Sequence, residues 1–353
     1  LTSTLDLSKV QIDRMLRSLQ KKDDPYELLV EKVEERDVRV LKDANLPGLG
    51  FARKTYRFYP EGPLFSQVSG FLGVGKDGAV RGLYGVEGFF EDELRGSGGF
   101  LEGLRGAQGA FMFSRKNAFQ PAVNGTNIVI TLDRAVQHVA CERLKKGVTE
   151  YGAESGALII INPQNGAIIA MCSVPDFDPN EYGKVSSASA YNNDTIFTAY
   201  EPGSIMKPLA MAAAINESLV GPRTTFTDPG VRNDLCETPI TNADKKSYGL
   251  QTMTNVLERS INTGMVFVAE KLGRERLFRY YTAFGFGVKT GISLHTESAG
   301  NISRLEKQTK QFLDCYGATA SFGQGITATP LQVALAYSAI ANGGTLLSPM
   351  IVE

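Results

Sequence analysis

The chain has 353 residues, of which 42% are hydrophobic and 21% are charged. This composition is ordinary for a globular protein, and the length corresponds to roughly two domains of 100–200 residues each. Lys and Arg number 37 and Asp and Glu number 38, so no basic excess indicates binding to nucleic acid. The longest apolar runs, such as residues 157–161 and 209–215, are too short to span a bilayer. Because the first residue is Leu1 rather than Met, we expect a segment of a longer protein.

The cysteines and histidines argue against two kinds of site. The four cysteines are widely spaced and form no C-x-x-C pair, so we expect no structural zinc site. Only His138 and His295 are available for a Ser-His-Asp triad, and we expect His138 on a helix surface or partly buried. Hydrolytic or acyl-transfer chemistry in this chain would therefore use a base other than histidine.

The residue composition of the first third of the chain changes near residue 45. Residues 1–45 are charged, carry apolar residues at helical spacing, and have a helix break at 21–25. Residues 45–124 are rich in glycine and short β-type runs, which predicts turn-rich α+β structure. The match to G-x-G-x-x-G at 73–78 opens no helix and lacks a βαβ context, so we interpret it as a turn.

A second block begins after residue 124. The pattern predicts a strand over 127–133, a helix over 135–148, and strands over 157–161 and 167–171 joined by a turn. Mostly helical sequence follows. We place the domain boundary near 120–125, with one domain at 1–122 and a second at 123–353.

The segment around Ser204 carries the clearest chemical signal. Pro202 and Gly203 precede Ser204, and an apolar run follows Lys207, which predicts that Ser204 begins a helix. Ser204 and Lys207 are three residues apart and so share one helix face. A serine hydroxyl becomes a good nucleophile only when a base takes its proton, and a lysine can be that base if burial lowers its pKa.

The S-x-x-K spacing is weak alone, because roughly one match is expected by chance in a chain this long. A second match, Ser18-x-x-Lys21, lies in a charged amphipathic segment, where a solvated helix face explains it. Ser260-x-Asn262 is a further element, between predicted helices at 252–258 and 265–272. Taken alone, Ser260 is better explained as an ordinary helix N-cap.

Together, Ser204-x-x-Lys207 and Ser260-x-Asn262 resemble the first two motifs of the penicillin-binding-protein transpeptidase family. Further segments in the same order resemble the monofunctional (class B) members from about residue 50 to 353. Three segments resemble their non-catalytic pedestal domain, at 57–60, 85–88 and 94–99. Four segments resemble their transpeptidase domain, at 129–137, 162–170, 175–180 and 321–332.

The resemblance implies an α+β protein, with a pedestal (dimerisation-type) domain followed by a β-lactamase-like serine transpeptidase domain. It implies a peptidoglycan D,D-transpeptidase that needs no cofactor or metal. Ser204 would attack the bond between two terminal D-alanines, Lys207 would act as base, Ser260 would relay a proton, and Asn262 would orient the substrate amide. Thr263, Gly323 and Gln324 are further candidates for substrate binding by the same resemblance.

The family's third motif, K-[ST]-G, needs separate treatment. The chain contains one such tripeptide, at 289–291, but it precedes the 323–325 segment, whereas the family's working motif follows that segment on a strand beside the serine. We therefore predict that 289–291 is an unrelated surface loop. The working motif would lie beyond Glu353, and 349–353 resembles a strand leading toward it.

The resemblance also implies partners and a location. Stem peptides ending in D-Ala-D-Ala and β-lactams would bind, and a SEDS-type glycan polymerase and divisome proteins would be partners. A membrane anchor outside this chain would place the catalytic domain outside the cytoplasmic membrane. S-x-N rather than S-x-D favours the division or sporulation branch. Two alternatives remain open: a β-lactamase or β-lactam sensor with the same serine and lysine, and a catalytically inactive cell-wall scaffold.

Overall fold

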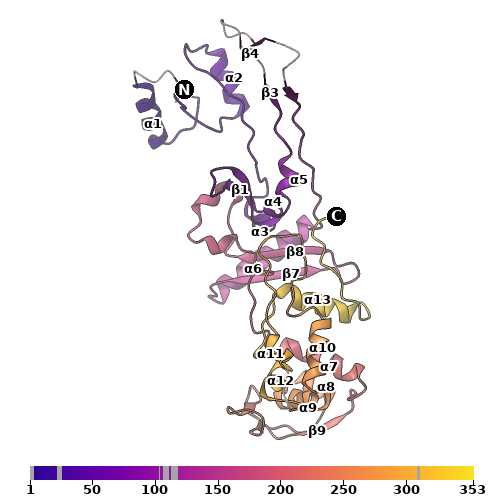
Figure 1. Cartoon of the computed structure of the whole chain (residues 1–353). Coiled ribbons are helices and arrows are strands. Elements are labelled where there is room, and N and C mark those ends of the chain that lie inside the picture. Colours follow the sequence, from indigo (N-terminus) through magenta and orange to yellow (C-terminus); the bar gives the residue numbers. More distant parts are fainter. Residues whose placement is uncertain (1–3, 22–25, 103, 106–110, 113–117, 308–310) are drawn as a thin grey trace. The chain divides into compact units, whose positions relative to one another are not determined.

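The computed structural model describes residues 4–21, 26–102, 104–105, 111–112, 118–307 and 311–353. The chain forms two compact units, residues 1–58 and 59–353, and each is considered by itself. Helices and short strands are mixed throughout, which confirms the α+β class (Figure 1). The domain boundary predicted near residue 122 stays a prediction.

The described residues of the first unit include the helices α1 (Lys9–Leu19) and α2 (Glu35–Asp43). Ser8 and Gln11 form a reciprocal capping box that satisfies donors at the start of α1. Met15 and Leu41 are the buried members of their helices. The charged helical character predicted for 1–45 is thus confirmed, while residues 22–25 of the predicted helix break lie outside the described part of the chain.

The second unit opens with two short helical turns and a β-hairpin. These elements are η1 (Gly62–Phe65), α3 (Ser66–Ser69), β1 (Phe71–Val74) and β2 (Val80–Leu83). The G-x-G-x-x-G segment forms the hairpin turn, where the Gly75 N–H donates to the Ala79 carbonyl at 2.8 Å. The interpretation of 73–78 as a turn is therefore confirmed. Two short helices follow, α4 (Gly85–Phe89) and α5 (Glu91–Arg95).

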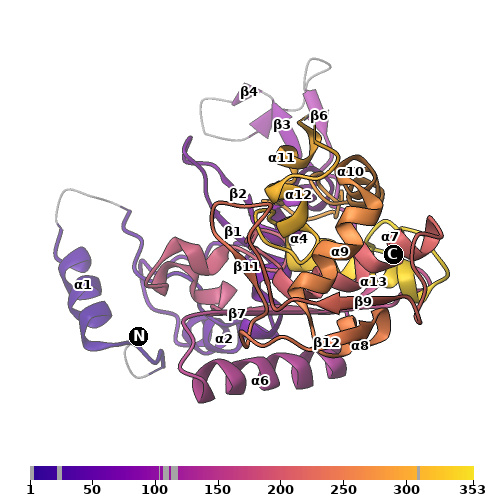
Figure 2. The same cartoon turned by 90° about the horizontal axis from the view of Figure 1, so that it is seen from below.

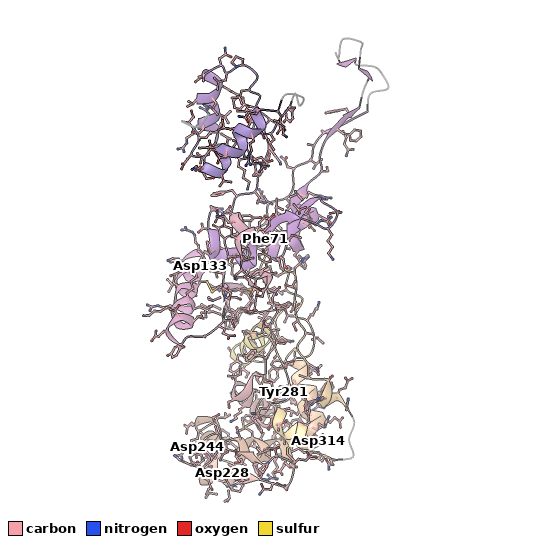
Figure 3. The ribbon with its side chains drawn as sticks, turned by 90° about the vertical axis from the view of Figure 1, so that its left-hand side faces the viewer. Phe71, Asp133, Asp228, Asp244, Tyr281 and Asp314 are labelled. Atoms are coloured by element: carbon pink, nitrogen blue, oxygen red, sulfur yellow. A yellow bond between two sulfur atoms is a disulfide. The ribbon has the colours of Figure 1, made fainter. Side chains whose placement is uncertain are left out.

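An aromatic cluster joins this hairpin to a segment more than 100 residues away in the chain. The ring of Phe71, labelled in Figure 3, stacks on Tyr182 with centroids 4.3 Å apart and meets Phe177 edge-on at 5.7 Å. Tyr182 belongs to η2 (Pro179–Lys184), and Tyr191, which also contacts Phe71, ends η3 (Ala188–Tyr191). These rings bury a large apolar area, so the hairpin and the 177–191 segment form one packed body.

Between α5 and the next helix, the described residues include short strands. They pair antiparallel as β3 (Phe100–Glu102) with β6 (Ala118–Gln120), and as β4 (Leu104–Arg105) with β5 (Phe111–Met112).

The centre of the second unit is a β-hairpin with helices packed against it. The hairpin consists of β7 (Gly156–Ile161) and β8 (Ile168–Val174), paired antiparallel. Both α6 (Arg134–Glu150) and α13 (Pro330–Ala341) contact it, and Figure 2 shows α6 running alongside β7. A disulfide between Cys141 and Cys172 joins α6 to β8. The predicted helix and both predicted strands are confirmed here, and His138 is exposed on α6.

The strand predicted over 127–133 is wrong. Only Ile130 makes a β-bridge, and its partner is Val352 near the other end of the chain. Thr131 donates its N–H to the Ile351 carbonyl at 3.0 Å, and Met350 bridges Ala167. Residues 350–352 therefore lie between 130–131 and 167–168, but they form isolated bridges rather than a strand. The sequence pattern identified the apolar segments 127–133 and 349–353, but it could not reveal how few residues of each would pair.

The remaining helices pack around a hydrophobic core of their own (Figure 1). They are listed in chain order as η4 (Gly203–Met206), α7 (Lys207–Asn216), α8 (Met253–Glu258), α9 (Asn262–Leu272), α10 (Arg274–Ala283), α11 (Ser303–Glu306) and α12 (Cys315–Ala320). Two antiparallel strand pairs lie at this end: β9 (Thr225–Asp228) with β12 (Gly249–Thr252), and β10 (Val231–Arg232) with β11 (Ile240–Thr241). A disulfide between Cys236 and Cys315 ties the segment before β11 to the start of α12.

Helix α9 runs through this core and is apolar on nearly all sides. Met265, Val266 and Val268 are fully buried, and α9 contacts α7, α8, α10, α12, β9 and β11. A helix that is apolar all round requires neighbours on every face, which these elements provide. In the described residues, no helix combines the length and the apolar character that crossing a membrane would need.

Gln137 gives a test of the packing between α6 and the hairpin. Its fully buried amide donates to the carbonyls of Leu64 and Met171 at 2.9 and 2.8 Å and accepts from the Met171 N–H at 2.8 Å. Gln137→Leu keeps similar volume but leaves those backbone groups without partners. We expect a loss of about 3 kcal/mol in the free energy of unfolding, measured by chemical denaturation. His138→Gln, at the exposed neighbouring position, is the control and should change it by less than about 0.5 kcal/mol.

Candidate active site

Ser204 lies on the short turn that leads into α7. Gly203–Met206 form a 3₁₀ turn, in which the Lys207 N–H donates a hydrogen bond to the Ser204 carbonyl. Helix α7 then begins at Lys207. Met206 is fully buried, which anchors the turn in the core, while the Ser204 side chain is exposed. In 3₁₀ geometry residues three apart lie one above the other, so Ser204 and Lys207 share a face. The predicted helix start at Ser204 is therefore a 3₁₀ turn joined to the helix.

Lys207 is the buried cation of this site. Only 2% of its surface is exposed. Its Nζ contacts three oxygen atoms: the Ser260 carbonyl at 2.6 Å, the Ser260 hydroxyl at 2.9 Å and the Asn262 Oδ1 at 2.7 Å. The structure thus brings the two sequence motifs together, at Lys207, from parts of the chain more than 50 residues apart.

The charge state of Lys207 follows from its burial. Removal from water penalises the ammonium form and lowers the pKa of Lys207 to about 8. The three acceptors are neutral oxygens, and in the described part of the chain no carboxylate forms an ion pair with Lys207. Roughly a tenth of the amine is therefore neutral at pH 7, far more than for an ordinary lysine, and a neutral amine has the lone pair that a base needs.

Ser260 occupies a strained position between α8 and α9. Its φ is +54°, a left-handed conformation that is uncommon for residues other than glycine. The Ile261 N–H donates to the Val256 carbonyl at 2.9 Å and the Ser260 N–H to the Leu257 carbonyl at 3.2 Å. These two bonds form a Schellman motif, in which glycine is usual at the Ser260 position. The conformation turns both the carbonyl and the hydroxyl of Ser260 toward Lys207.

Ser260 is not the N-cap of α9. The N-cap residue of α9 is Ile261, and no side chain caps that end. The interpretation favoured for Ser260 in isolation is therefore wrong, because the helix begins two residues later with Asn262. Asn262 donates its Nδ2 to the Thr241 carbonyl at 2.8 Å, which points its Oδ1 at Lys207. The unused lone pair and N–H of this amide leave capacity for a further partner.

The segment 323–328 runs beside the Ser204 turn. The Gly203 N–H donates to the Gly323 carbonyl at 3.0 Å, and Tyr200 and Ala328 form a β-bridge. Gly323 has a φ of +81°, and a Cβ there would overlap the backbone of Gly203. Gly323 thus supports the turn through its backbone, while the neighbouring Gln324 is exposed. Their predicted contact with substrate stays a prediction.

Two other residues named from the sequence, Thr263 and Lys289, have different surroundings. Thr263 is 1% exposed, and its hydroxyl donates to the Asp228 carboxylate, so it lies behind the site. Its predicted contact with substrate also stays a prediction. Lys289 is exposed on an irregular segment, where the Thr290 N–H and hydroxyl both bind the Glu297 carboxylate. The prediction that 289–291 forms a surface loop rather than a strand is confirmed.

The sequence analysis missed the residues that support Asn262. Thr241 accepts the Asn262 amide, and Asp228 and Asn242 bind the adjacent Thr263. No spacing motif connects these positions, since the supporting residues lie 21–35 residues before their partners Asn262 and Thr263. The strand pairs β9–β12 and β10–β11 hold this part of the chain together. Within the described residues, no group of three or more His, Cys, Asp or Glu side chains is placed to hold a metal ion.

Comparison with known proteins identifies two family domains. The family described as "Penicillin binding protein transpeptidase domain" matches residues 156–353. The family described as "Penicillin-binding Protein dimerisation domain" matches residues 1–130. Ser204, Lys207, Ser260 and Asn262 all lie within the first match.

Similar proteins and structures agree with these domains. Stage V sporulation protein D of Bacillus subtilis is 34% identical over 325 residues, which cover 91% of this chain and 49% of that protein. Peptidoglycan D,D-transpeptidase FtsI of Escherichia coli is 28% identical over 304 residues, which cover 86% of this chain and 49% of FtsI. The apo crystal structure of penicillin binding protein 3 from Mycobacterium tuberculosis has a TM-score of 0.71 at 27% identity, covering 84% of this chain and 61% of that chain.

The chain spans about half the length of the curated relatives it matches. The match to the transpeptidase domain covers more than half of the chain, and the order of the two domains is that predicted from the sequence motifs. The chain belongs to the penicillin-binding proteins of the monofunctional (class B) type, with a dimerisation domain ahead of the transpeptidase domain.

Proposed function

We propose that this chain carries the nucleophile and base of a peptidoglycan D,D-transpeptidase that β-lactams inactivate. The observation that carries the proposal is the buried amine of Lys207, whose pKa is lowered to about 8, one turn from the exposed Ser204. Relatives named as peptidoglycan D,D-transpeptidases support it. Exposure of Ser204 leaves its hydroxyl accessible to a large polymeric substrate.

The first half of the proposed reaction forms an ester. Neutral Lys207 accepts the proton of the Ser204 hydroxyl as Ser204 Oγ bonds to the carbonyl carbon between two terminal D-alanines. The amide bond breaks, and the departing D-alanine nitrogen receives a proton from Lys207 by way of the Ser260 hydroxyl. The 2.9 Å contact between Lys207 Nζ and Ser260 Oγ supports this relay. The rest of the stem peptide stays bound to Ser204 as an ester.

The second half transfers the peptide to an amine. The amine of a neighbouring stem peptide attacks the ester carbonyl, the bond to Ser204 Oγ breaks, and the proton that the amine loses is transferred to Ser204 Oγ. The new amide is the cross-link. The remaining donor and acceptor sites of the Asn262 amide would orient the peptide substrate, and Thr263, Gly323 and Gln324 remain weaker candidates for substrate binding. None of these steps requires a cofactor or metal.

We also propose an extracytoplasmic location and a role in division or sporulation. The two disulfides, Cys141–Cys172 and Cys236–Cys315, are typical of proteins in oxidising compartments. A relative named for sporulation and the relative FtsI support the role. A membrane anchor, a SEDS-type glycan polymerase and divisome proteins as partners are part of the same proposal.

Substitution of Ser204 tests the nucleophile. We expect the full-length protein to form a stable covalent adduct with a fluorescent penicillin, and Ser204→Ala to abolish it, because no hydroxyl remains to be acylated. Ser18→Ala, in the chance S-x-x-K match on α1, is the control and should label normally. Mass spectrometry distinguishes the outcomes: rapid turnover of the adduct would indicate a β-lactamase, no adduct an inactive scaffold, and labelling of Ser204→Ala a different nucleophile.

Lys207→Arg tests the base. A guanidinium keeps the positive charge but does not lose its proton in proteins, so acylation should slow by a factor on the order of 10²–10⁴. In the unsubstituted protein, the acylation rate should rise about tenfold per pH unit and level off near pH 8, because Lys207 must be neutral. Stopped-flow measurement of acylation against pH checks both. A near-normal rate in Lys207→Arg would remove this lysine from the mechanism.

Lys289→Ala tests the tripeptide at 289–291. Lys289 is exposed on a loop whose backbone is held by Glu297, so we expect the rate of penicillin acylation to be unchanged. The same stopped-flow measurement applies. A loss of tenfold or more would show that this loop belongs to the site after all.

A further inference from the structure

A buried carboxylate lies behind Asn262. Asp228, at the end of β9, is 2% exposed and accepts four hydrogen bonds. Its Oδ1 accepts from the Gly230 N–H at 2.8 Å and from the Thr263 hydroxyl. Its Oδ2 accepts from Asn242 Nδ2 and from the Tyr248 N–H, both at 2.9 Å. The four acceptor sites of a carboxylate are thus all occupied, from three separate parts of the chain.

This network continues to the Asn262 side chain through adjacent residues. The Thr263 N–H donates to Asn242 Oδ1 at 3.2 Å, and Asn262 Nδ2 donates to the Thr241 carbonyl at 2.8 Å. Residues 262–263 are therefore joined to residues 241–242 by two neighbouring bonds. Because Asp228 binds both Asn242 and Thr263, it fixes the spacing between these two segments.

The spacing determines which end of the Asn262 amide faces Lys207. While the Thr241 carbonyl accepts from Nδ2, the Oδ1 must point at Lys207, which it meets at 2.7 Å. If the Thr241 carbonyl moved away, the Asn262 amide could turn and present its NH₂ group to Lys207. A charged lysine donates hydrogen bonds but cannot accept them, so no hydrogen bond would form there. Lys207 would then lose one of its three oxygen partners.

We infer that Asp228 is a positioning residue for the proposed transpeptidase reaction, holding residues 241–242 against 262–263 so that the oxygen of Asn262 faces Lys207. The inference rests on the proposed function for its catalytic consequence. The orientation of Asn262 itself depends only on the contacts described above.

Two charged residues next to this network, Asp244 and Arg259, are exposed. Figure 3 shows Asp228 and Asp244 in the same region of the structure. Asp244 accepts from the Tyr248 hydroxyl, and the Arg259 guanidinium lies 5.2 Å from the centre of the Tyr248 ring. The Asp228 carboxylate itself accepts only from uncharged N–H and O–H groups, and the contacts of Lys207 are to neutral oxygens.

Asp228→Asn is the primary test. An amide of the same shape must place an NH₂ group against either Gly230 and Thr263 or Asn242 and Tyr248, so at least one backbone N–H faces another donor. We expect the limiting rate of penicillin acylation to fall on the order of 10- to 100-fold, with little change in the initial binding constant. Losing an oxygen partner also destabilises the Lys207 ammonium, so its pKa should fall below about 8.

Two further variants complete the design. Thr263→Val removes one hydrogen-bond donor to Asp228 and keeps a similar side-chain volume. Like Asp228→Asn, it should lower both the acylation rate and the pKa of Lys207. If Asp228→Asn does not fold, Thr263→Val decides the question. Ser247→Ala is the matched control. The Ser247 hydroxyl donates to the main-chain carbonyl of Asp228 at 2.7 Å rather than to its carboxylate, so both readouts should stay at their unsubstituted values.

The two readouts separate this inference from the proposed function. The pKa of Lys207 is measured by NMR of the lysine ¹³Cε signal, assigned by its loss in Lys207→Arg, and needs no penicillin. Absence of acylation in the unsubstituted protein would overturn the proposed function, yet the NMR titration would still decide whether Asp228 orients Asn262. A folded Asp228→Asn or Thr263→Val protein with unchanged Lys207 pKa and unchanged acylation would overturn the inference.

Discussion

The arrangement of the active site depends on one buried amino group. Placing the Lys207 ammonium out of water is costly, and among the residues that the structure describes this cost is offset by uncharged oxygens from Ser260 and Asn262. A carboxylate partner would have held the lysine charged and removed its ability to take a proton. Neutral acceptors instead leave its pKa near 8, where both protonation states are accessible. The motif residues Ser260 and Asn262 thus set the chemistry of Lys207 as well as contacting substrate in the proposed reaction.

Local sequence was sufficient to find the residues that perform this chemistry. Ser204 and Lys207 are three residues apart, so spacing alone predicted that they share a face, while Ser260 and Asn262 were found as a short motif between two predicted helices. What spacing could not show is that the two motifs meet at Lys207 Nζ. That meeting results from the packing of α7 against α9, a contact between distant parts of the chain. The family resemblance supplied it in advance, while the residue patterns alone favoured an ordinary cap at Ser260.

The same distinction explains which parts of the fold were predicted. The turn at 73–78, the helix at 134–150 and the hairpin of β7 and β8 are defined by contacts between near neighbours in the chain. The segment 127–133 has the composition of a strand, but its partner is 350–352, and only isolated bridges form. The supporting residue Asp228 was missed for a related reason: a lone aspartate gives no pattern, and its four donors lie up to 35 residues from it in the chain.

The strained backbone at Ser260 shows how stability and chemistry are balanced here. The left-handed position of a Schellman motif favours glycine, and a residue with a Cβ costs roughly 1 kcal/mol or more there. Glycine would relieve that strain and could still direct its carbonyl at Lys207, but it would remove the hydroxyl that lies 2.9 Å from the amine. The surrounding structure is built to tolerate the cost, since the two residues that follow Ser260 are held in place: Ile261 is fully buried, and Asn262 donates to the Thr241 carbonyl. Residues that pack the turn therefore contribute to the chemistry, because without them the chain could relax from the conformation that places the hydroxyl beside the base.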